Sequence, residues 1–116
     1  MSKLDEIEFI RHIYVEVRFI LDSMSEVSED EFYEDEILKR AITRAFEIIG
    51  EATKNLSLDF RLKYNNVPHN YMAKLRDRII HHYQGVDFEM IWNITRENIP
   101  ELDLQITKII NEHSYK

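Results

Sequence analysis

Residues 76–83 carry the side chains best suited to chemistry, and they read Arg-Asp-Arg-Ile-Ile-His-His-Tyr. Histidine titrates near neutral pH and can act as a general base or acid. Arginine offers a permanently charged, planar fork that binds phosphate oxygens. Together they can cleave an RNA phosphodiester without a metal ion, if a base removes the 2′-OH proton and a cation stabilises the pentavalent phosphate. Arg76 and His81 are therefore the candidate catalytic pair, with His81 as acid or base and Arg76 as phosphate stabiliser.

On an ideal α-helix these side chains do not all point the same way. His81 lies five positions after Arg76 and is rotated from it by ~140°, whereas Tyr83 returns to within ~20° of Arg76. Asp77 and His81 are four residues apart, so Asp77 is expected to orient His81 and favour its protonated form. Two arrangements would bring Arg76 and His81 to one phosphate: unwinding of the helix near Gly85, or a two-fold axis that places a second copy opposite.

Charge along the chain is uneven. The formal net charge is −7, which argues against nonspecific adhesion to nucleic acid. Residues 61–82 nevertheless contain five Lys or Arg against one acidic residue, and three histidines in addition. Such a basic island in an acidic protein indicates a bounded site for an anion rather than a general DNA-binding surface. Within it, Lys74, Arg78 and His82 are further candidates for RNA contacts.

Each of these residues also has an interpretation without chemistry. Most surface arginines are simply solvated, and a histidine near a helix C-terminus is often held there by the helix dipole. Tyr83 alone would be an aromatic residue at the edge of the core with a solvated hydroxyl. The spacing of Arg76 and His81 occurs by chance in many helical proteins, so by itself it is a weak signal of catalysis.

Apolar residues spaced three and four positions apart predict long helices before this segment. We expect a first helix over residues 4–24 and a second over residues 37–55. Ser28 and Glu31 fit a capping box, so a helical turn is expected to begin there. Residues 58–64 are compatible with a short helix. The second helix is expected to bury one stripe of its residues, namely Ile37, Ala41, Ala45, Ile48 and Ala52, with Leu38, Ile42, Phe46 and Ile49 beside it.

The candidate residues themselves are expected on a third main helix, which Pro68 opens and Gly85 ends as its C′ residue. Asp87 should cap a fourth helix, and Pro100 must kink or split that helix. These elements predict an all-α fold, an up-down bundle of four to five helices. The inward-facing residues of the third helix are expected to be Met72, Leu75, Ile79 and Tyr83.

The 116 residues suffice for one domain, which we take to span residues 1–116. With only two Gly and two Pro, the sequence favours long helices over strands and turns. The absence of cysteine excludes disulfides and thiolate metal sites. No apolar run approaches the roughly 18 residues of a membrane span, and the N-terminus does not resemble a signal peptide. A cytoplasmic protein without membrane association is expected.

Three separated segments resemble one known family, the HepT branch of the HEPN superfamily. Residues 44–57 are similar to that family's upstream block, and residues 98–102 are similar to its closing helix. The resemblance extends over about residues 4–110, far beyond the spacing of two side chains. The similar motif itself is Arg76-x4-His81-x-Tyr83, followed by Gly85-Val86-Asp87 and Ile91-Trp92.

The resemblance implies a homodimeric, metal-independent endoribonuclease without a cofactor, in which Arg76 and His81 of both copies face each other across a cleft. It also implies the toxin of a type VII-like toxin–antitoxin pair. The antitoxin of that family is a small MNT-type nucleotidyltransferase that adds AMP to the tyrosine of the motif, here Tyr83. Two positions depart from the family pattern. Asp77 stands where asparagine is common, and would tune His81 or slightly repel RNA; Gln84 stands where an aromatic residue is frequent.

Two other functions fit the same residues. In the first alternative, the chain is a noncatalytic helical subunit that presents substrate or nucleotide to a separate nucleotidyltransferase, and the basic island is used for binding only. Alternatively, it would be a purely structural dimer built on the broad apolar stripe of the first helix. RNA cleavage in EDTA that is lost on His81→Ala separates the ribonuclease from both.

Overall fold

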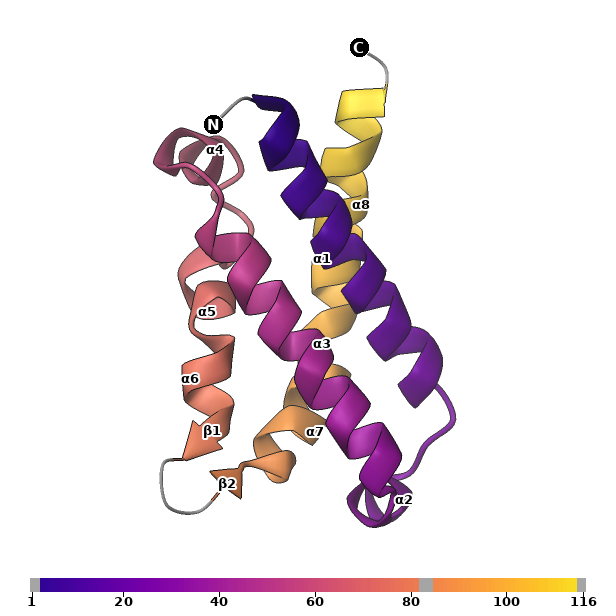
Figure 1. Cartoon of the computed structure of the whole chain (residues 1–116). Helices are drawn as coiled ribbons and strands as arrows, with labels where there is room; N and C mark the ends of the chain where they lie inside the picture. The colour runs from indigo at the N-terminus through magenta and orange to yellow at the C-terminus, as the bar shows by residue number, and fades with distance from the viewer. Residues whose placement is uncertain (1–2, 82–84, 115–116) are drawn as a thin grey trace.

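The computed structural model describes residues 3–81 and 85–114, and most of them are helical (Figure 1). Helix α1 (Lys3–Met24) packs against both α3 (Glu36–Lys54) and α8 (Ile99–Ser114), and α7 (Phe88–Glu97) leads into α8. These four long helices form the body of the bundle, and the predicted all-α class is confirmed. The shorter helices of the described ranges are α2 (Glu29–Glu34), α4 (Leu58–Lys63), α5 (His69–Ala73) and α6 (Leu75–Ile79).

The core forms where the apolar faces of the long helices meet. The predicted stripe of the second helix is wrong at one end, because Ile37 is 82% exposed and the buried face is rotated toward Ile42 and Phe46. Elsewhere residues spaced three and four positions apart are buried, as the periodicity predicts. The main buried residues are Ile10, Ile13, Val17 and Ile20 of α1, Ile42, Phe46 and Ile49 of α3, and Ile106 and Ile109 of α8.

Local signals fix where three of the helices begin. Ser28 and Glu31 form the predicted capping box of α2, with hydrogen bonds of 3.1 and 3.0 Å between each side chain and the other residue's backbone N–H. Asp87 caps α7, as predicted, and its carboxylate accepts from the backbone N–H of Met90 at 3.0 Å. The predicted split of the fourth helix is also confirmed, since α8 starts just before Pro100. Proline is tolerated in a first helical turn because the N–H it lacks has no partner there.

The predicted third helix is wrong in its length. The sequence predicts one helix from Pro68 to Gly85, but the structure has α5, then a break at Lys74, and then α6, which ends at Ile79. The helix therefore stops before the second half of the motif. Gly85 lies beyond this end and is not its C′ residue.

A short antiparallel pair of strands follows α6. Strand β1 (Ile80–His81) pairs with β2 (Gly85–Val86), and the register places His81 opposite Gly85. Gly85 has a φ of 82°, in the left-handed region that favours glycine. The backbone N–H of Asp87 then donates to the carbonyl of Ile79 at 2.7 Å. A carbonyl at the end of α6 is thus satisfied by the returning chain instead of by a further helical turn, which explains why the helix ends there.

The motif segment lies on one side of the bundle. Helices α5 and α6 pack against α3, and the two strands lie at the end of the molecule away from the start of α1 and the end of α8 (Figure 1). Within the two described ranges, no helix combines the length and apolar character that a bilayer crossing requires.

Candidate active site

Helix α6 displays the basic part of the motif on a buried anchor. Leu75 and Ile79, four residues apart, are only 2% and 1% exposed, so they fix one face of this short helix in the core. Arg76, Asp77 and Arg78 lie between them in sequence and are all exposed. An arginine held in this way meets an anion from solvent while its backbone stays fixed.

Gly50 of α3 permits the close contact that holds this segment. A Cβ atom at Gly50 would lie 3.3 Å from the carbonyl oxygen of Met72 and 3.6 Å from that of Ala73. It would lie 4.0 Å from the backbone nitrogen of Arg76. The backbones of α3 and of the α5–α6 segment therefore approach closely here, and a side chain at residue 50 would force them apart by a few tenths of an ångström. Sequence reasoning missed this role, although an isolated glycine inside a strongly predicted helix is a signal of close packing.

Arg76 faces an acidic residue of α3. Its Nε lies 3.7 Å from Oε2 of Glu47, and the two side chains are 51% and 28% exposed. A pair this long and this exposed contributes at most about 1 kcal/mol. The pair therefore orients Arg76 weakly, and a phosphate group can compete with Glu47 for the guanidinium. Glu47 was not among the predicted site residues.

The remaining cations of α5 and α6 differ in how they are held. Arg78 lies over the ring of Tyr71, with its Cζ 4.8 Å from the ring centroid, a cation–π contact that keeps the guanidinium at the surface. Lys74 is exposed at the break between α5 and α6. In residues 3–81 and 85–114, no three His, Asp or Glu side chains are grouped so that they would hold a metal ion.

His81 belongs to a different element from Arg76. Its backbone lies in β1, opposite Gly85, whereas its side chain lies outside the described part of the chain. Because α6 ends at Ile79, the helical register that would pair Asp77 with His81, and align Tyr83 with Arg76, does not apply. Of the two arrangements considered above, unwinding of the helix is expected near Gly85, whereas α6 already ends at Ile79, six residues earlier. A second copy across a two-fold axis stays a prediction, and His82 and Tyr83 lie outside the described residues.

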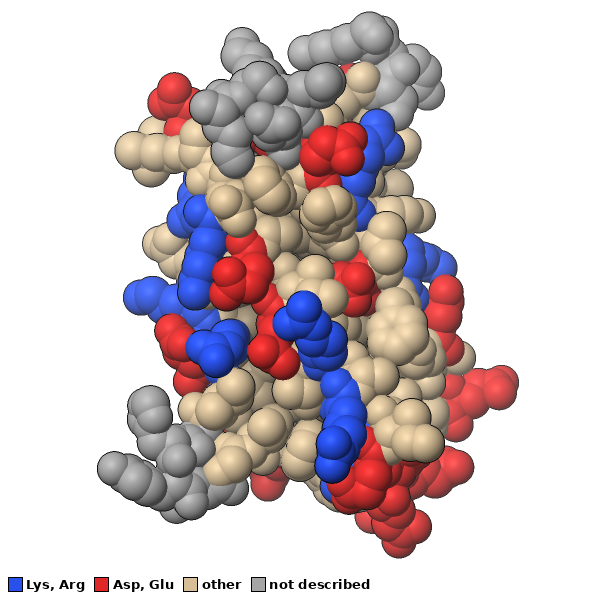
Figure 2. Space-filling view, in the orientation of Figure 1, with Lys and Arg blue, Asp and Glu red and all other residues tan. Residues whose placement is uncertain are grey.

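The face that includes α1, α3 and α6 mixes charges of both signs (Figure 2). Between α1 and α3, burial raises the pKa of Glu16, and the charges of Arg44 and His12 oppose that rise. Acidic side chains gather at the lower end over α2 and the start of α3 (Figure 2), among them Glu29, Asp30, Glu34 and Glu36. On this face the chain therefore offers local positive spots at α6 rather than a long basic track.

All of these residues fall within one family match. The sequence pattern of the family described as "Ribonuclease HepT-like" matches residues 4–109, from the start of α1 into the last turns of α8. The chain belongs to the HepT-like family. The resemblance inferred from the motif is thereby confirmed, and the all-α bundle agrees with it.

Relatives of this HepT-like chain carry ribonuclease names. A "Putative RNase" of Caldanaerobacter subterraneus is 39% identical over 104 residues, which cover 90% of this chain and 93% of the relative. A protein of Methanocaldococcus jannaschii with the same name is 40% identical over 112 residues, or 97% and 93% of the two chains. The "Probable ribonuclease HepT" of Thermococcus cleftensis is 34% identical over 102 residues, or 88% and 93%. No solved structure gives a significant match.

Proposed function

We propose that this HepT-like chain is a metal-independent endoribonuclease, with His81 as the acid–base group and Arg76 as the phosphate stabiliser. The observation that carries the proposal is the way the motif segment folds. Helix α6 is anchored by Leu75 and Ile79 and displays Arg76, and the chain then leaves the helix so that His81 follows on an extended segment. His81 is thereby free of the helical rotation that would turn it away from Arg76. Family membership and the names of the relatives support the same activity.

In the proposed reaction the RNA supplies its own nucleophile. The imidazole of His81 takes the proton of a 2′-OH, the 2′ oxygen bonds to the adjacent phosphorus, and the bond from phosphorus to the 5′ oxygen breaks. The departing 5′ oxygen receives a proton from an imidazolium. The products are a 2′,3′-cyclic phosphate and a 5′-hydroxyl. Arg76 stabilises the non-bridging oxygens, whose negative charge increases in the pentavalent state.

The proposed site is composite, formed where two copies of the chain meet about a two-fold axis. A single chain has a net charge of −7, and its Arg76 already faces Glu47. Two copies of α6 and β1 around one cleft double the local positive charge and supply two copies of His81, one as base and one as acid. Lys74, Arg78 and His82 then contact the flanking phosphates.

Control of this activity is proposed to act through Tyr83, as the toxin half of a type VII-like toxin–antitoxin pair. Tyr83 lies in the connection between His81 and Gly85, whose backbones are paired. Addition of AMP to Tyr83 by a small MNT-type nucleotidyltransferase would place a charged, bulky group two residues from His81. Tyr83→Phe is expected to retain cleavage and to escape control; AMP found on that variant by intact-mass analysis after coexpression with the partner would contradict this.

A cleavage assay with a matched histidine control tests the catalytic assignment. The purified chain is incubated with a set of structured and unstructured RNAs in EDTA, next to His81→Ala and His12→Ala variants; His12 is exposed on α1. Wild type and His12→Ala should cut, and His81→Ala should lose ~10²–10⁴-fold in rate while keeping the same circular dichroism spectrum. A folded wild-type dimer that leaves every RNA intact would instead favour the noncatalytic binding subunit.

A further inference from the structure

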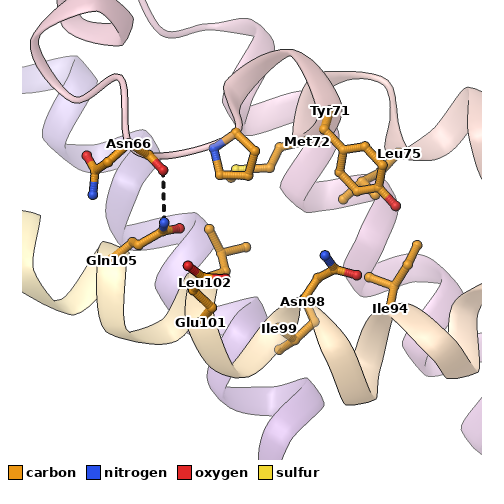
Figure 3. Close-up of a pocket in the computed structure, with 11 residues that line it drawn as sticks. Asn66, Tyr71, Met72, Leu75, Ile94, Asn98, Ile99, Glu101, Leu102 and Gln105 are labelled. Carbon is orange, nitrogen blue, oxygen red and sulfur yellow. Dashed lines mark hydrogen bonds between the residues drawn. The ribbon is translucent and has the colours of Figure 1, made fainter.

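A pocket of about 320 Å³ lies between α5–α6 and the junction of α7 with α8 (Figure 3). Its floor is apolar and belongs to the core: Met72, Leu75 and Leu102 line it and are buried. This volume is at the low end of the range for ligand sites, and a hollow of this size fits one small planar group rather than a peptide.

Polar groups with unused hydrogen-bonding capacity surround that floor. Nε2 of Gln105 donates to the carbonyl oxygen of Asn66 at 2.9 Å, which fixes the amide and leaves its oxygen available. The side chain of Asn98 points into the gap toward Tyr71 (Figure 3) and forms no hydrogen bond with the described residues. An apolar floor below a few convergent amide and hydroxyl groups is the usual make-up of a small-molecule site.

Tyr71 joins the pocket to the candidate active site. Its ring lines the pocket, and Arg78 of α6 lies over that ring at 4.8 Å. Arg78 is two residues from Arg76 on the same short helix. A ligand that places a phosphate on Arg78 therefore has its neighbouring groups within reach of the pocket, whereas Arg76 leaves α6 on another side, ~200° away.

We propose that the pocket receives one unpaired nucleobase of the RNA, next to the phosphate held at α6. This inference rests on the proposed function and adds a specificity subsite to it. The flat base would lie on the apolar floor, and the amides of Asn98 and Gln105 would bond to its polar edge, as in other proteins that read splayed-out RNA bases. Asn98 and Gln105 are thus specificity-determining residues and not catalytic ones.

The acidic surroundings decide which part of the nucleotide enters. Glu101 lines the pocket, and a second hollow that shares Tyr71 and Asn98 with it is lined by Asp87, Glu89 and Glu97. Carboxylates repel phosphate, so the RNA backbone stays on the α6 side and only the uncharged base inserts. Carboxylates also accept hydrogen bonds, so bases with an exocyclic amino group are favoured over uracil.

Binding of a non-cleavable probe tests the pocket separately from catalysis. The probe is a single-stranded, fully 2′-O-methylated oligonucleotide with one 2-aminopurine, compared with the same strand carrying an abasic site there. We expect the abasic strand to bind wild type about tenfold more weakly, in line with the loss of one or two hydrogen bonds and base packing. Asn98→Leu, similar in size and without an amide, should discriminate between the two strands less than wild type does, because one of the two amides that bond to the base is lost.

Asn111→Leu is the matched control, because Asn111 is an exposed asparagine further along α8, outside this pocket. It should discriminate between the strands as wild type does, and Tyr71→Ala provides a second pocket variant if Asn98→Leu has a lower melting temperature. If wild type and both pocket variants discriminated equally between the two strands, the base-pocket proposal would be overturned, whether or not the chain cleaves RNA.

Two further measurements distinguish a failure of the base pocket from a failure of the proposed nuclease function. Sequencing of the cleavage ends from a random RNA pool should show a base preference next to the cleaved bond, and Asn98→Leu should weaken that preference. Cleavage with no base preference would contradict the base pocket but not the nuclease function. If the protein discriminated between the methylated strands with and without the base but cleaved no RNA, the nuclease function would be contradicted and the base pocket would not. Adenosine monophosphate that binds as tightly as the oligonucleotide would identify a mononucleotide site and overturn the RNA assignment.

Discussion

Gly50→Ala is the perturbation that best tests how α3 positions the candidate site. The new methyl group would lie 3.3 Å from the carbonyl oxygen of Met72 and 3.6 Å from that of Ala73. Both are backbone atoms, so no flexible side chain can move aside. The α5–α6 segment, which carries Arg76, must instead retreat from α3 by a few tenths of an ångström.

Two opposing effects set the change in stability. Alanine is favoured over glycine in a helix interior by about 0.5–1 kcal/mol. Forcing a methyl group into a packed site costs about 1–3 kcal/mol. The free energy of unfolding should therefore fall by about 0–2.5 kcal/mol, which a folded domain tolerates. Catalysis is more sensitive to position, since a misplacement of about 1 Å can cost ~100-fold. A shift of a few tenths should lower kcat/KM by about three- to tenfold.

The assay compares stability and activity in the same preparations. Urea unfolding followed by circular dichroism gives the free energy of unfolding, and a fluorogenic RNA oligonucleotide gives kcat/KM. Glu51→Ala is the control, because Glu51 is the next residue of α3 and its side chain is exposed. Gly50→Val, which adds two more methyl groups at the same contact, should lower both quantities further than Gly50→Ala.

Either of two results would refute this reasoning. If Gly50→Ala raised the free energy of unfolding by the full helix-propensity gain and left kcat/KM at the level of Glu51→Ala, the contact would not constrain the motif. A parallel loss of activity in both variants would equally contradict it, because the loss would then belong to α3 in general rather than to the close approach at Gly50.

Three further predictions concern single contacts. Glu47→Gln removes the acidic partner of Arg76 and should tighten binding of a methylated oligonucleotide at low salt, measured by fluorescence anisotropy, while stability changes by less than about 1 kcal/mol; weaker binding would contradict it. In Gly85→Ala the new Cβ would have no atom within 4 Å, but the residue must still adopt a φ of 82°. The free energy of unfolding, measured in urea, should therefore fall by about 1–2 kcal/mol, and an unchanged midpoint would argue against this backbone conformation. Burial lowers the pKa of His69 below 6.5, so the unfolded chain binds more protons and stability falls as the pH drops through about 6.5. His69→Gln should flatten that fall between about pH 7.5 and about pH 5.5, and an unchanged slope would rule out His69 as its cause.

Most of the helical framework was predictable because its signals are local. Ser28 with Glu31 and Asp87 with Met90 bond within a single turn, and Pro100 restricts its own neighbours. Periodicity likewise locates α1 and α3 along the chain. It was less reliable about which face of α3 is buried, because Ile37 is apolar and yet exposed, and burial depends on where α1 and α5 lie.

The end of α6 was not predictable from the same kind of signal. Met72, Leu75 and Ile79 continue a helical pattern that Tyr83 extends, so periodicity favours a longer helix. In the structure α6 ends because the backbone N–H of Asp87, eight residues later, donates a hydrogen bond to the carbonyl oxygen of Ile79. A helical turn and a returning chain compete for that carbonyl. In the sequence only the glycine at position 85, which has a φ of 82° in the structure, hints at the returning chain.

For the candidate site, residue types pointed to Arg76 and His81, but the residues that position Arg76 were missed. Glu47 and Gly50 lie on α3, far earlier in the sequence, and act through tertiary contacts that no spacing rule encodes. The pocket was missed for the same reason, since it joins Tyr71 with Asn98 and Gln105 from separate helices.

The early end of α6 also changes how control at Tyr83 would work. On a continuous helix, Tyr83 would share a face with Arg76, and a modification there would block the phosphate site directly. With the helix ending at Ile79, Arg76 is fixed by buried side chains of α6, whereas His81 is held by backbone pairing with Gly85. Tyr83 lies between those paired residues. In the proposed mechanism, a charged group on Tyr83 would therefore disturb the placement of His81 before it affected Arg76, and we expect proton transfer to fail while the cations of α6 still bind RNA.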